Sequence, residues 1–258
     1  MLSFKEISKY FSPKENQFPQ LVLKEYLQYK ILDIVFSSKY GDKLVFMGGT
    51  AIRLVYGNDR FSEDLDLDNT GLSKKDFDNL IRIIQRELKA EGIEVEVRNT
   101  FKDVYHCYMK FPRILFGNKL SPLKDEKILI RLDSFHTKEA QNVRPFALSR
   151  ADIFSEIRVY PVSIILSQKI EALFKRKRSK GRDIYDIIYL FSFTKPEYAL
   201  LEKSIKIDNE HDLFEEMYKL FTEKELDILA KDVEPFLLDS KKVNQVRKFR
   251  LWIESYRK

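Results

Sequence analysis

The spacing of apolar residues divides the chain into two parts with different periods. Up to about residue 160, helical stripes are interspersed with short runs in which every second residue is apolar, which predicts helices and strands together. From Pro161 onward, apolar residues recur about every 3.6 positions, which predicts helices alone. We therefore expect an α+β part over 1–160 and a helical lobe over 161–258.

Two amphipathic helices are predicted in the first part. One begins at Pro19 and ends near Tyr40-Gly41, and the other follows the capping residue Ser73 and ends at Gly92. Residues 1–16 are predicted to form a short helix or an arm. Strands are predicted over 44–47, 64–68, 93–101, 104–111, 127–134 and 156–160, and loops over 117–126 and 135–155.

The sharpest signal is the alternation of aspartate and leucine over residues 64–68. Side chains at i and i+2 of a strand share one face, so Asp64, Asp66 and Asp68 point one way while Leu65 and Leu67 point into a core. Neighbouring carboxylates repel one another unless a cation lies between them, and Mg²⁺ or Mn²⁺ suits such an all-oxygen site. A solvated acidic edge strand is the alternative interpretation.

A double glycine, Gly48-Gly49, follows the apolar run 44–47 and precedes a helix predicted over 50–56. Because glycine has no Cβ, backbone N–H groups at this turn can approach a ligand closely, and the first helical turn favours phosphate. A phosphate-binding turn beside metal-binding carboxylates is the apparatus of nucleotide phosphoryl transfer. An ordinary strand-to-helix turn is the alternative, but Arg60 and Ser62 between the two features favour the functional interpretation.

Asp133 and Lys169 are further candidates for the same chemistry. Asp133 lies near the end of the strand predicted over 127–134, where it is either a third metal carboxylate or the cap of the following turn. Lys169 has only apolar neighbours on its face of a predicted helix. Such a lysine either reaches past the core with its alkyl chain or is held at the edge of a pocket.

A basic segment separates two helices of the predicted lobe. It is either a platform for RNA phosphates or a solvated turn near a helix end. On the helix that follows, Asp183 and Asp186 lie on one face, a turn apart. The six cations of the segment are Lys175, Arg176, Lys177, Arg178, Lys180 and Arg182.

Composition narrows the classes of protein. The chain has 258 residues, 44% of them hydrophobic, which is enough for a sizeable core, and its net charge of +6 is compatible with a nucleic-acid partner. A single cysteine, Cys107, excludes an intrachain disulfide framework. We see neither a signal peptide nor a run of about 20 apolar residues, so we expect a cytoplasmic protein with no membrane partner.

Two motifs in this order resemble those of the AbiEii/MenT-type nucleotidyltransferase toxins, which belong to the DNA polymerase β-like nucleotidyltransferase superfamily. The similarity extends over roughly residues 44–190. The first motif reads Met47-Gly48-Gly49-Thr50-Ala51-Ile52-Arg53-Leu54 and then Arg60-Phe61-Ser62-Glu63-Asp64-Leu65-Asp66-Leu67. The second consists of Lys169, the basic segment and Arg182-Asp183-Ile184-Tyr185-Asp186.

The resemblance implies a polymerase β-like nucleotidyltransferase core, a mixed sheet with flanking helices, followed by the helical lobe. It implies that Mg²⁺ or Mn²⁺ is held by Asp64, Asp66 and Asp133. The implied catalytic residues are Asp64, Asp66, Asp133, Lys169 and Asp183. The implied nucleotide-binding residues are Gly48, Gly49, Thr50, Arg60, Ser62, Lys169, Asp183 and Asp186. Whether Asp183 or Asp186 is the functional acid stays open, with Asp183 favoured by its spacing from Lys169.

The resemblance also implies an activity. The protein is expected to be the toxin of an AbiE-like, phage-defence toxin–antitoxin pair, with a cognate antitoxin protein as a partner. It is expected to transfer nucleotides from a nucleoside triphosphate to RNA, at the 3′ acceptor end of tRNA, with release of pyrophosphate. A small-molecule nucleotidyltransferase of the aminoglycoside type and a non-catalytic nucleic-acid-binding protein on this scaffold are the alternatives.

Overall fold

A computed structural model describes residues 1–102, 104–137, 140 and 142–257. The chain forms two compact units. The first comprises Met1–Val55 and Phe61–Tyr160, and the second comprises Tyr56–Arg60 and Pro161–Lys258. The change of hydrophobic period at Pro161 coincides with the junction of the units. Residues 56–60, which the sequence analysis assigned to the first part, belong to the second.

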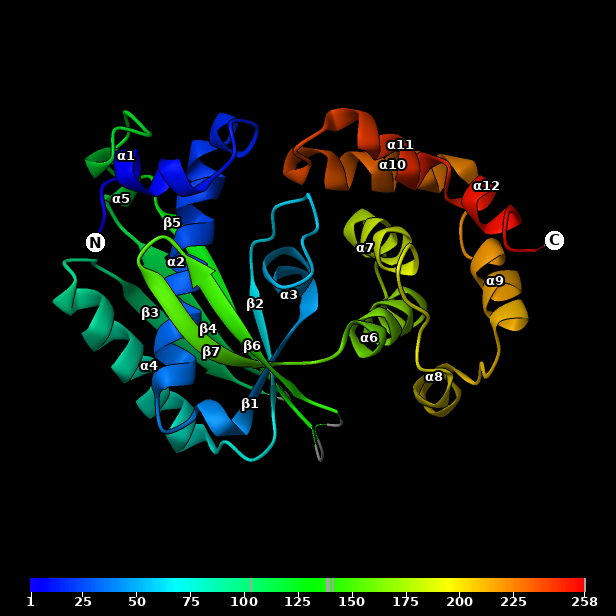
Figure 1. Cartoon of the computed structure of the whole chain (residues 1–258), viewed down its shortest axis with the longest axis horizontal. Helices are drawn as coiled ribbons and strands as arrows, with labels where there is room; N and C mark the ends of the chain where they lie inside the picture. The colour runs from blue at the N-terminus through cyan, green and yellow to red at the C-terminus, as the bar shows by residue number, and fades with distance from the viewer. Residues whose placement is uncertain (103, 138–139, 141, 258) are drawn as a thin grey trace. The chain divides into compact units, whose positions relative to one another are not determined.

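A mixed seven-stranded sheet forms the centre of the first unit, in the order β3-β4-β5-β2-β1-β7-β6 (Figure 1). β2 and β5 are parallel, as are β1 and β7, whereas β1–β2, β3–β4, β4–β5 and β6–β7 are antiparallel. The strands are β1 Leu44–Met47, β2 Leu65–Asn69, β3 Glu96–Phe101, β4 Val104–Phe111, β5 Ile128–His136, β6 Arg144–Arg150 and β7 Ile153–Val159.

The two long helices of this unit follow their sequence signals. The helix that begins at Pro19 has proline in its first turn and packs on the sheet, where it contacts β7 (Figure 1). The second long helix begins with a capping box between Ser73 and Asp76. The helices of the first unit are α1 Phe4–Ile7, α2 Pro19–Ser37, α3 Gly48–Leu54, α4 Lys74–Ala90 and α5 Ile114–Gly117.

The prediction of a loop over residues 135–155 is wrong for most of that range. β5 continues to His136, and β6 and β7 form an antiparallel hairpin. Pro145 lies in β6, an edge strand, where a missing N–H is tolerated. The hairpin turn contains Ala151 with a φ of 54°, a conformation that alanine rarely adopts and that gives no sequence signal. Residues 138, 139 and 141 of this predicted loop lie outside the described residues.

The second unit is helical, as predicted. Where α7 begins, a Cβ on Gly181 would lie 1.8 Å from the carbonyl oxygen of Leu229, so α7 meets α10 at backbone distance. Its helices are α6 Val162–Lys175, α7 Gly181–Phe191, α8 Tyr198–Ile205, α9 Glu210–Lys219, α10 Glu223–Val233, α11 Val243–Arg247 and α12 Phe249–Glu254.

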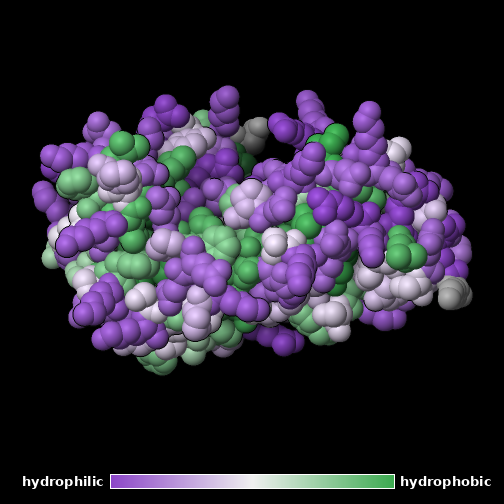
Figure 2. All heavy atoms as spheres, turned by 90° about the horizontal axis from the view of Figure 1, so that it is seen from above, coloured by the Kyte–Doolittle hydropathy of each residue, from purple (hydrophilic) through white to green (hydrophobic). Residues whose placement is uncertain are grey.

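The face of the helical unit that Figure 2 shows is mainly polar. Hydrophilic side chains dominate the face seen in Figure 2, although Ile228 of α10 is 62% exposed. Among the helices that the structure describes, none combines the length and the apolar character needed to cross a membrane.

Candidate active site

Carboxylates from two neighbouring strands face each other in the first unit. The parallel register of β2 and β5 sets Asp66 opposite Asp133, and paired strands lie about 4.8 Å apart. Asp64 directly precedes β2. The structure therefore sets Asp66 and Asp133 on adjacent strands, with Asp64 immediately before the strand that carries Asp66. Asp133 lies inside β5, which ends at His136, rather than near a strand end as predicted.

Two basic side chains hold these carboxylates. Arg131 lies with Nη2 3.1 Å from Asp64 Oδ2 and with Nε 3.0 Å from Asp133 Oδ2. His106 Nδ1 lies 2.7 Å from Asp133 Oδ1. The sequence analysis assigned no role to either residue. Arg131 had a signal, because it precedes Asp133 by two positions on one strand face, whereas His106 is set only by the register of β4 on β5.

The environment of Asp64 favours an additional cation. Burial raises the pKa of the Asp64 carboxyl above its ordinary value, and the negative charge of Asp133 acts in the same direction. The guanidinium of Arg131 acts against both. Since the charged carboxylate is disfavoured here, a further positive charge close to it would stabilise the ionised form.

The double glycine turn lies directly against one of the acids. Gly48 has a φ of +76°, and a Cβ at this position would lie 2.1 Å from Asp66 Oδ2. β1 ends at Met47 and α3 begins at Gly48, two residues earlier than the predicted helix. Glycine at position 48 thus serves both the left-handed backbone and the space that the Asp66 carboxylate occupies.

Two other predicted nucleotide contacts have structural neighbours. Thr50 is fully buried, and its hydroxyl donates a hydrogen bond to the backbone carbonyl of Asp64. The side chain of Gln28 donates to the carbonyl of Ser62 over 3.0 Å. Both bonds hold the segment that leads to Asp64. Contact of Thr50 or Ser62 with a nucleotide stays a prediction.

The last aspartate of the alternating run has a separate environment. Asp68 is 9% exposed, and the hydroxyl of Tyr160 donates to its Oδ2 over 2.7 Å. Burial raises the pKa of the Asp68 carboxyl above its ordinary value, although the bond from Tyr160 lowers it in part. Asp68 is therefore held by the sheet and its neighbours.

We expect Asp68→Asn to stabilise the protein at neutral pH and to lose this advantage in acid. A pKa raised on folding means that the folded state binds the proton more tightly, so stability falls as pH rises from the unfolded pKa through the folded pKa. Asparagine does not titrate, so this loss of stability is absent, and its side-chain oxygen can still accept a hydrogen bond from the Tyr160 hydroxyl. Urea unfolding of both proteins between acid and neutral pH measures the effect. A stability difference independent of pH would contradict it.

A buried ion cluster lies within the helical unit. Lys169 Nζ is 2.9 Å from Asp183 Oδ1 and 2.9 Å from Asp186 Oδ2. Arg60 meets Asp186 with two bonds, Nε to Oδ1 at 2.7 Å and Nη2 to Oδ2 at 2.6 Å. Asn58 Nδ2 donates to Asp186 Oδ1 over 2.9 Å. Segment 56–60 is thereby tied to α6 and α7.

The two acids of this cluster differ in their surroundings. Asp186 is fully buried, and the charges of Arg60 and Lys169 outweigh its burial and lower its pKa. Asp183 is paired with Lys169 and also with Arg176, whose side chain is 42% exposed. Burial would lower the pKa of Lys169, but the two carboxylates raise it overall. Asp183 thus lies nearer to solvent-exposed charge, and Asp186 anchors Arg60.

The basic segment between α6 and α7 is partly engaged. Lys175 pairs with Glu171 one turn back on α6, over 2.6 Å. The guanidinium carbon of Arg182 lies 4.6 Å from the ring centre of Phe236. Lys177 and Arg178 are exposed. RNA binding by this segment stays a prediction.

A family model described as "Nucleotidyl transferase AbiEii toxin, Type IV TA system" matches residues 30–250. The chain belongs to the AbiEii nucleotidyltransferase toxin family. It is therefore a nucleotidyltransferase and a toxin of a type IV toxin–antitoxin system, and the recognition made from its two motifs is confirmed. No curated protein matches the sequence.

Solved structures support the fold of this AbiEii-family chain. JHP933 from Helicobacter pylori is 18% identical with a TM-score of 0.56, and the match covers 92% of each chain. MenT4, a nucleotidyltransferase toxin from Mycobacterium tuberculosis H37Rv, is 17% identical with a TM-score of 0.56, and the match covers 98% of this chain and 90% of that one. The predicted α+β fold is confirmed.

The family implies a nucleoside triphosphate substrate and a divalent cation, and the acids of β2 and β5 fit such an ion in chemical type. Asp66 and Asp133 supply carboxylate oxygens from paired positions of the two strands, and the missing Cβ of Gly48 leaves room for the Asp66 carboxylate. As placed, Asp64 and Asp133 turn to Arg131, and within the described residues no three His, Cys, Asp or Glu side chains group closely enough to hold a metal.

We expect Gly48→Ala to impair this AbiEii-family enzyme more than Gly92→Ala. Both positions have a φ of +76°, where alanine costs about 1–2 kcal/mol, but the Cβ at Gly92 meets no atom within 4 Å. At Gly48 the Cβ displaces Asp66, so nucleotide transfer should fall about 10²-fold. Urea unfolding and initial rates of transfer measure the two effects. Equal loss of transfer in both variants would contradict the reason given.

Proposed function

We propose that this protein transfers a nucleotide from a nucleoside triphosphate to a hydroxyl of RNA, with the 3′ acceptor end of tRNA as the acceptor. The observation that carries the proposal is the pairing of Asp66 with Asp133 beside Gly48, with Asp64 joined to Asp133 through Arg131. Acids so arranged suit phosphoryl transfer, in which positioning and charge provide most of the catalysis.

Asp64, Asp66 and Asp133 are the residues that would hold Mg²⁺ or Mn²⁺. When bound, such an ion offsets charge on the triphosphate and lowers the pKa of an acceptor hydroxyl. Arg131 and His106 keep Asp133 oriented, the first by an ion pair at Oδ2 and the second by a hydrogen-bond contact at Oδ1. Arg131 also pairs with Asp64, so one guanidinium holds two of the three acids that would bind the ion.

In the proposed reaction the acceptor oxygen attacks the α-phosphorus of the triphosphate. A new P–O bond forms while the bond to the bridging oxygen of pyrophosphate breaks, and Asp133 takes the hydroxyl proton. Backbone N–H groups at Gly48 and Gly49 approach the triphosphate because no Cβ lies in the way. The contacts of Thr50 and Ser62 described above hold the segment that leads to Asp64.

We propose that Lys169 and Asp183 contact the nucleotide. Lys169 provides positive charge for the triphosphate, and Asp183 is the better candidate acid because Arg176 links it to exposed positions. Arg60 is 2% exposed and bound to Asp186. We therefore give Arg60 and Asp186 the role of orienting Lys169 rather than that of primary nucleotide ligands.

The positive charge of the protein supports RNA as the acceptor. The net charge is +6, and Lys177 and Arg178 of the basic segment are exposed for phosphate contacts. Modification of tRNA would stop growth, which fits a toxin whose cognate antitoxin is a partner and whose system serves phage defence. Both substrates are cytoplasmic, so we expect the reaction there.

A labelled transfer assay tests the proposal. Purified protein is incubated with total tRNA, Mg²⁺ and each of the four α-³²P nucleoside triphosphates in turn, and products are resolved on denaturing gels. We expect label in tRNA, and none after periodate oxidation of its 3′ end. Label on an aminoglycoside but not on RNA would replace this acceptor with a small molecule. RNA binding without any transfer would leave only a binding protein.

A further inference from the structure

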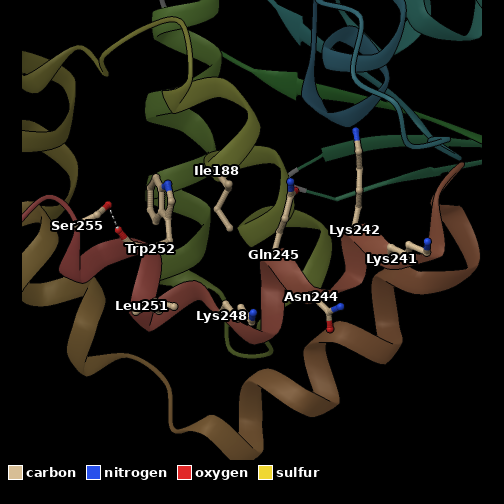
Figure 3. Close-up of a pocket in the computed structure, with 9 residues that line it drawn as sticks. All are labelled: Ile188, Lys241, Lys242, Asn244, Gln245, Lys248, Leu251, Trp252 and Ser255. Carbon is tan, nitrogen blue, oxygen red and sulfur yellow. Dashed lines mark hydrogen bonds between the residues drawn. The ribbon is translucent and has the colours of Figure 1, made fainter.

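A groove of about 510 Å³ lies within the helical unit, among α7, α11 and α12 (Figure 3). Ile188 of α7 and Trp252 of α12 line it, as does Leu251 of α12, which is 61% exposed. Its volume is that of a site for a small organic molecule or one nucleotide. The mechanism proposed above uses none of these residues.

We propose that this groove binds one nucleotide of an RNA chain, with the base against Trp252 and the neighbouring phosphates at Lys241 and Lys248. The inference rests on the proposed function, because it gives the RNA acceptor a second contact on the helical unit. The chemistry it requires is an anion joined to a flat, largely apolar ring.

The charges around the groove favour an anion. Lysines at positions 241, 242 and 248 line it, and none of its lining residues is Asp or Glu. Lys242 is paired with Asp59. Within the described part of the chain, the side chains of Lys241 and Lys248 have no ion-pair partner, so their charges are available to phosphates.

The aromatic wall of the groove is held in place from behind. The indole of Trp252 is stacked on Phe249, with ring centres 5.6 Å apart and planes 14° apart, and Phe191 and Phe214 contact it at steep angles. It stays partly exposed toward the groove. A fixed, partly open aromatic ring is a stacking surface for a base of any identity.

Polar groups at the groove suit the edge of a base. Gln245 extends from α11 on the same side as Lys242 in Figure 3, and it also lines a second cavity of about 240 Å³ that shares Ile188 and Trp252. An acidic peptide would meet the same lysines. However, a stable protein partner buries about 800 Å² per side, which a groove of nucleotide size does not provide.

The chain contains one tryptophan, so its fluorescence reports directly on this groove. We expect a short single-stranded RNA of mixed sequence to quench Trp252 emission in the full chain, with EDTA present and no triphosphate added. Lys241→Gln with Lys248→Gln should weaken binding about tenfold and lower the salt slope by about 1.4. The matched control replaces Lys203 and Lys224, exposed lysines of α8 and α10, by glutamine and should leave binding unchanged.

Four results would overturn the inference. The first is RNA binding, measured by the anisotropy of fluorescent RNA, without a change in Trp252 emission. The second is that the control pair of substitutions weakens RNA binding as much as the pair at Lys241 and Lys248. The third and fourth are that a mononucleotide quenches Trp252 emission as strongly as RNA does, and that an acidic peptide quenches it while RNA does not. Trp252→Leu, which can loosen the aromatic cluster, is not needed for any of these readouts. If RNA quenches Trp252 emission but never receives the ³²P-labelled nucleotide, only the proposed function is contradicted. If RNA receives the labelled nucleotide without quenching Trp252 emission, only this inference is contradicted.

Discussion

Asp66→Asn is expected to lower nucleotide transfer about 10³-fold or more, with little change in the free energy of unfolding. The carboxylate lies opposite Asp133 and against Gly48, at the proposed metal site, where a divalent ion would provide several kcal/mol of charge stabilisation. Each 1.4 kcal/mol is a factor of ten in rate. Asparagine keeps the shape of the side chain and reduces the repulsion among the acids. Initial rates of label transfer and urea unfolding give the two numbers.

Asp68→Asn is the matched control for this loss. It removes the same charge two residues further along β2, where Tyr160 already binds the carboxylate. We expect its transfer rate to stay within a few-fold of the unmodified enzyme. If Asp66→Asn transferred normally and Asp68→Asn did not, the acids assigned to catalysis would be the wrong ones.

Asp186→Asn should destabilise the helical unit by about 3–5 kcal/mol, the cost of leaving buried charge without its partner. Asp186 is fully buried. Without its negative charge, Arg60, which is 2% exposed, loses its ion-pair partner, and Lys169 loses one of its two partners. The single tryptophan, Trp252, lies in this unit, so its emission during urea unfolding follows the loss directly.

Two further variants separate this cause from a general loss of charge. Glu171→Gln breaks a solvent-exposed pair with Lys175 on α6 and should cost less than about 0.5 kcal/mol. Replacing Arg60 by methionine together with Asp186→Leu should cost less than Asp186→Asn alone, because no unpaired charge remains at that contact. A double variant as unstable as the single one would show that packing, and not charge, dominates the cluster.

Local signals predicted most elements where side-chain chemistry is strong. The proline that begins α2, the capping box of α4 and the aspartate–leucine alternation of β2 each act within a few residues. Strand β6 and the first part of β7 were missed because the hairpin turn uses Ala151 at a positive φ and the edge strand includes Pro145, whereas the strand predicted over 156–160 overlaps the end of β7. The folded structure accommodates both features, but in the sequence alone each of them is typical of a loop.

Arg60 shows the limit of sequence reasoning at the candidate site. Its place between the double glycine and Asp64 suggested a nucleotide contact, yet its side chain pairs with Asp186, 126 residues away. Arg131 and His106 likewise gain their roles from strand register. No local pattern encodes such partners, since they depend on which strands and helices are brought together.

The sequence alone determined the family, the change from mixed to helical structure at Pro161 and the candidate acids, because motifs, periodicity and residue chemistry are local properties of the chain. Only the tertiary structure decided which charges meet: Asp66 with Asp133, Arg131 with two acids, Arg60 with Asp186. Charge pairing acts over a few ångströms, and the distances that matter are set by packing across the chain.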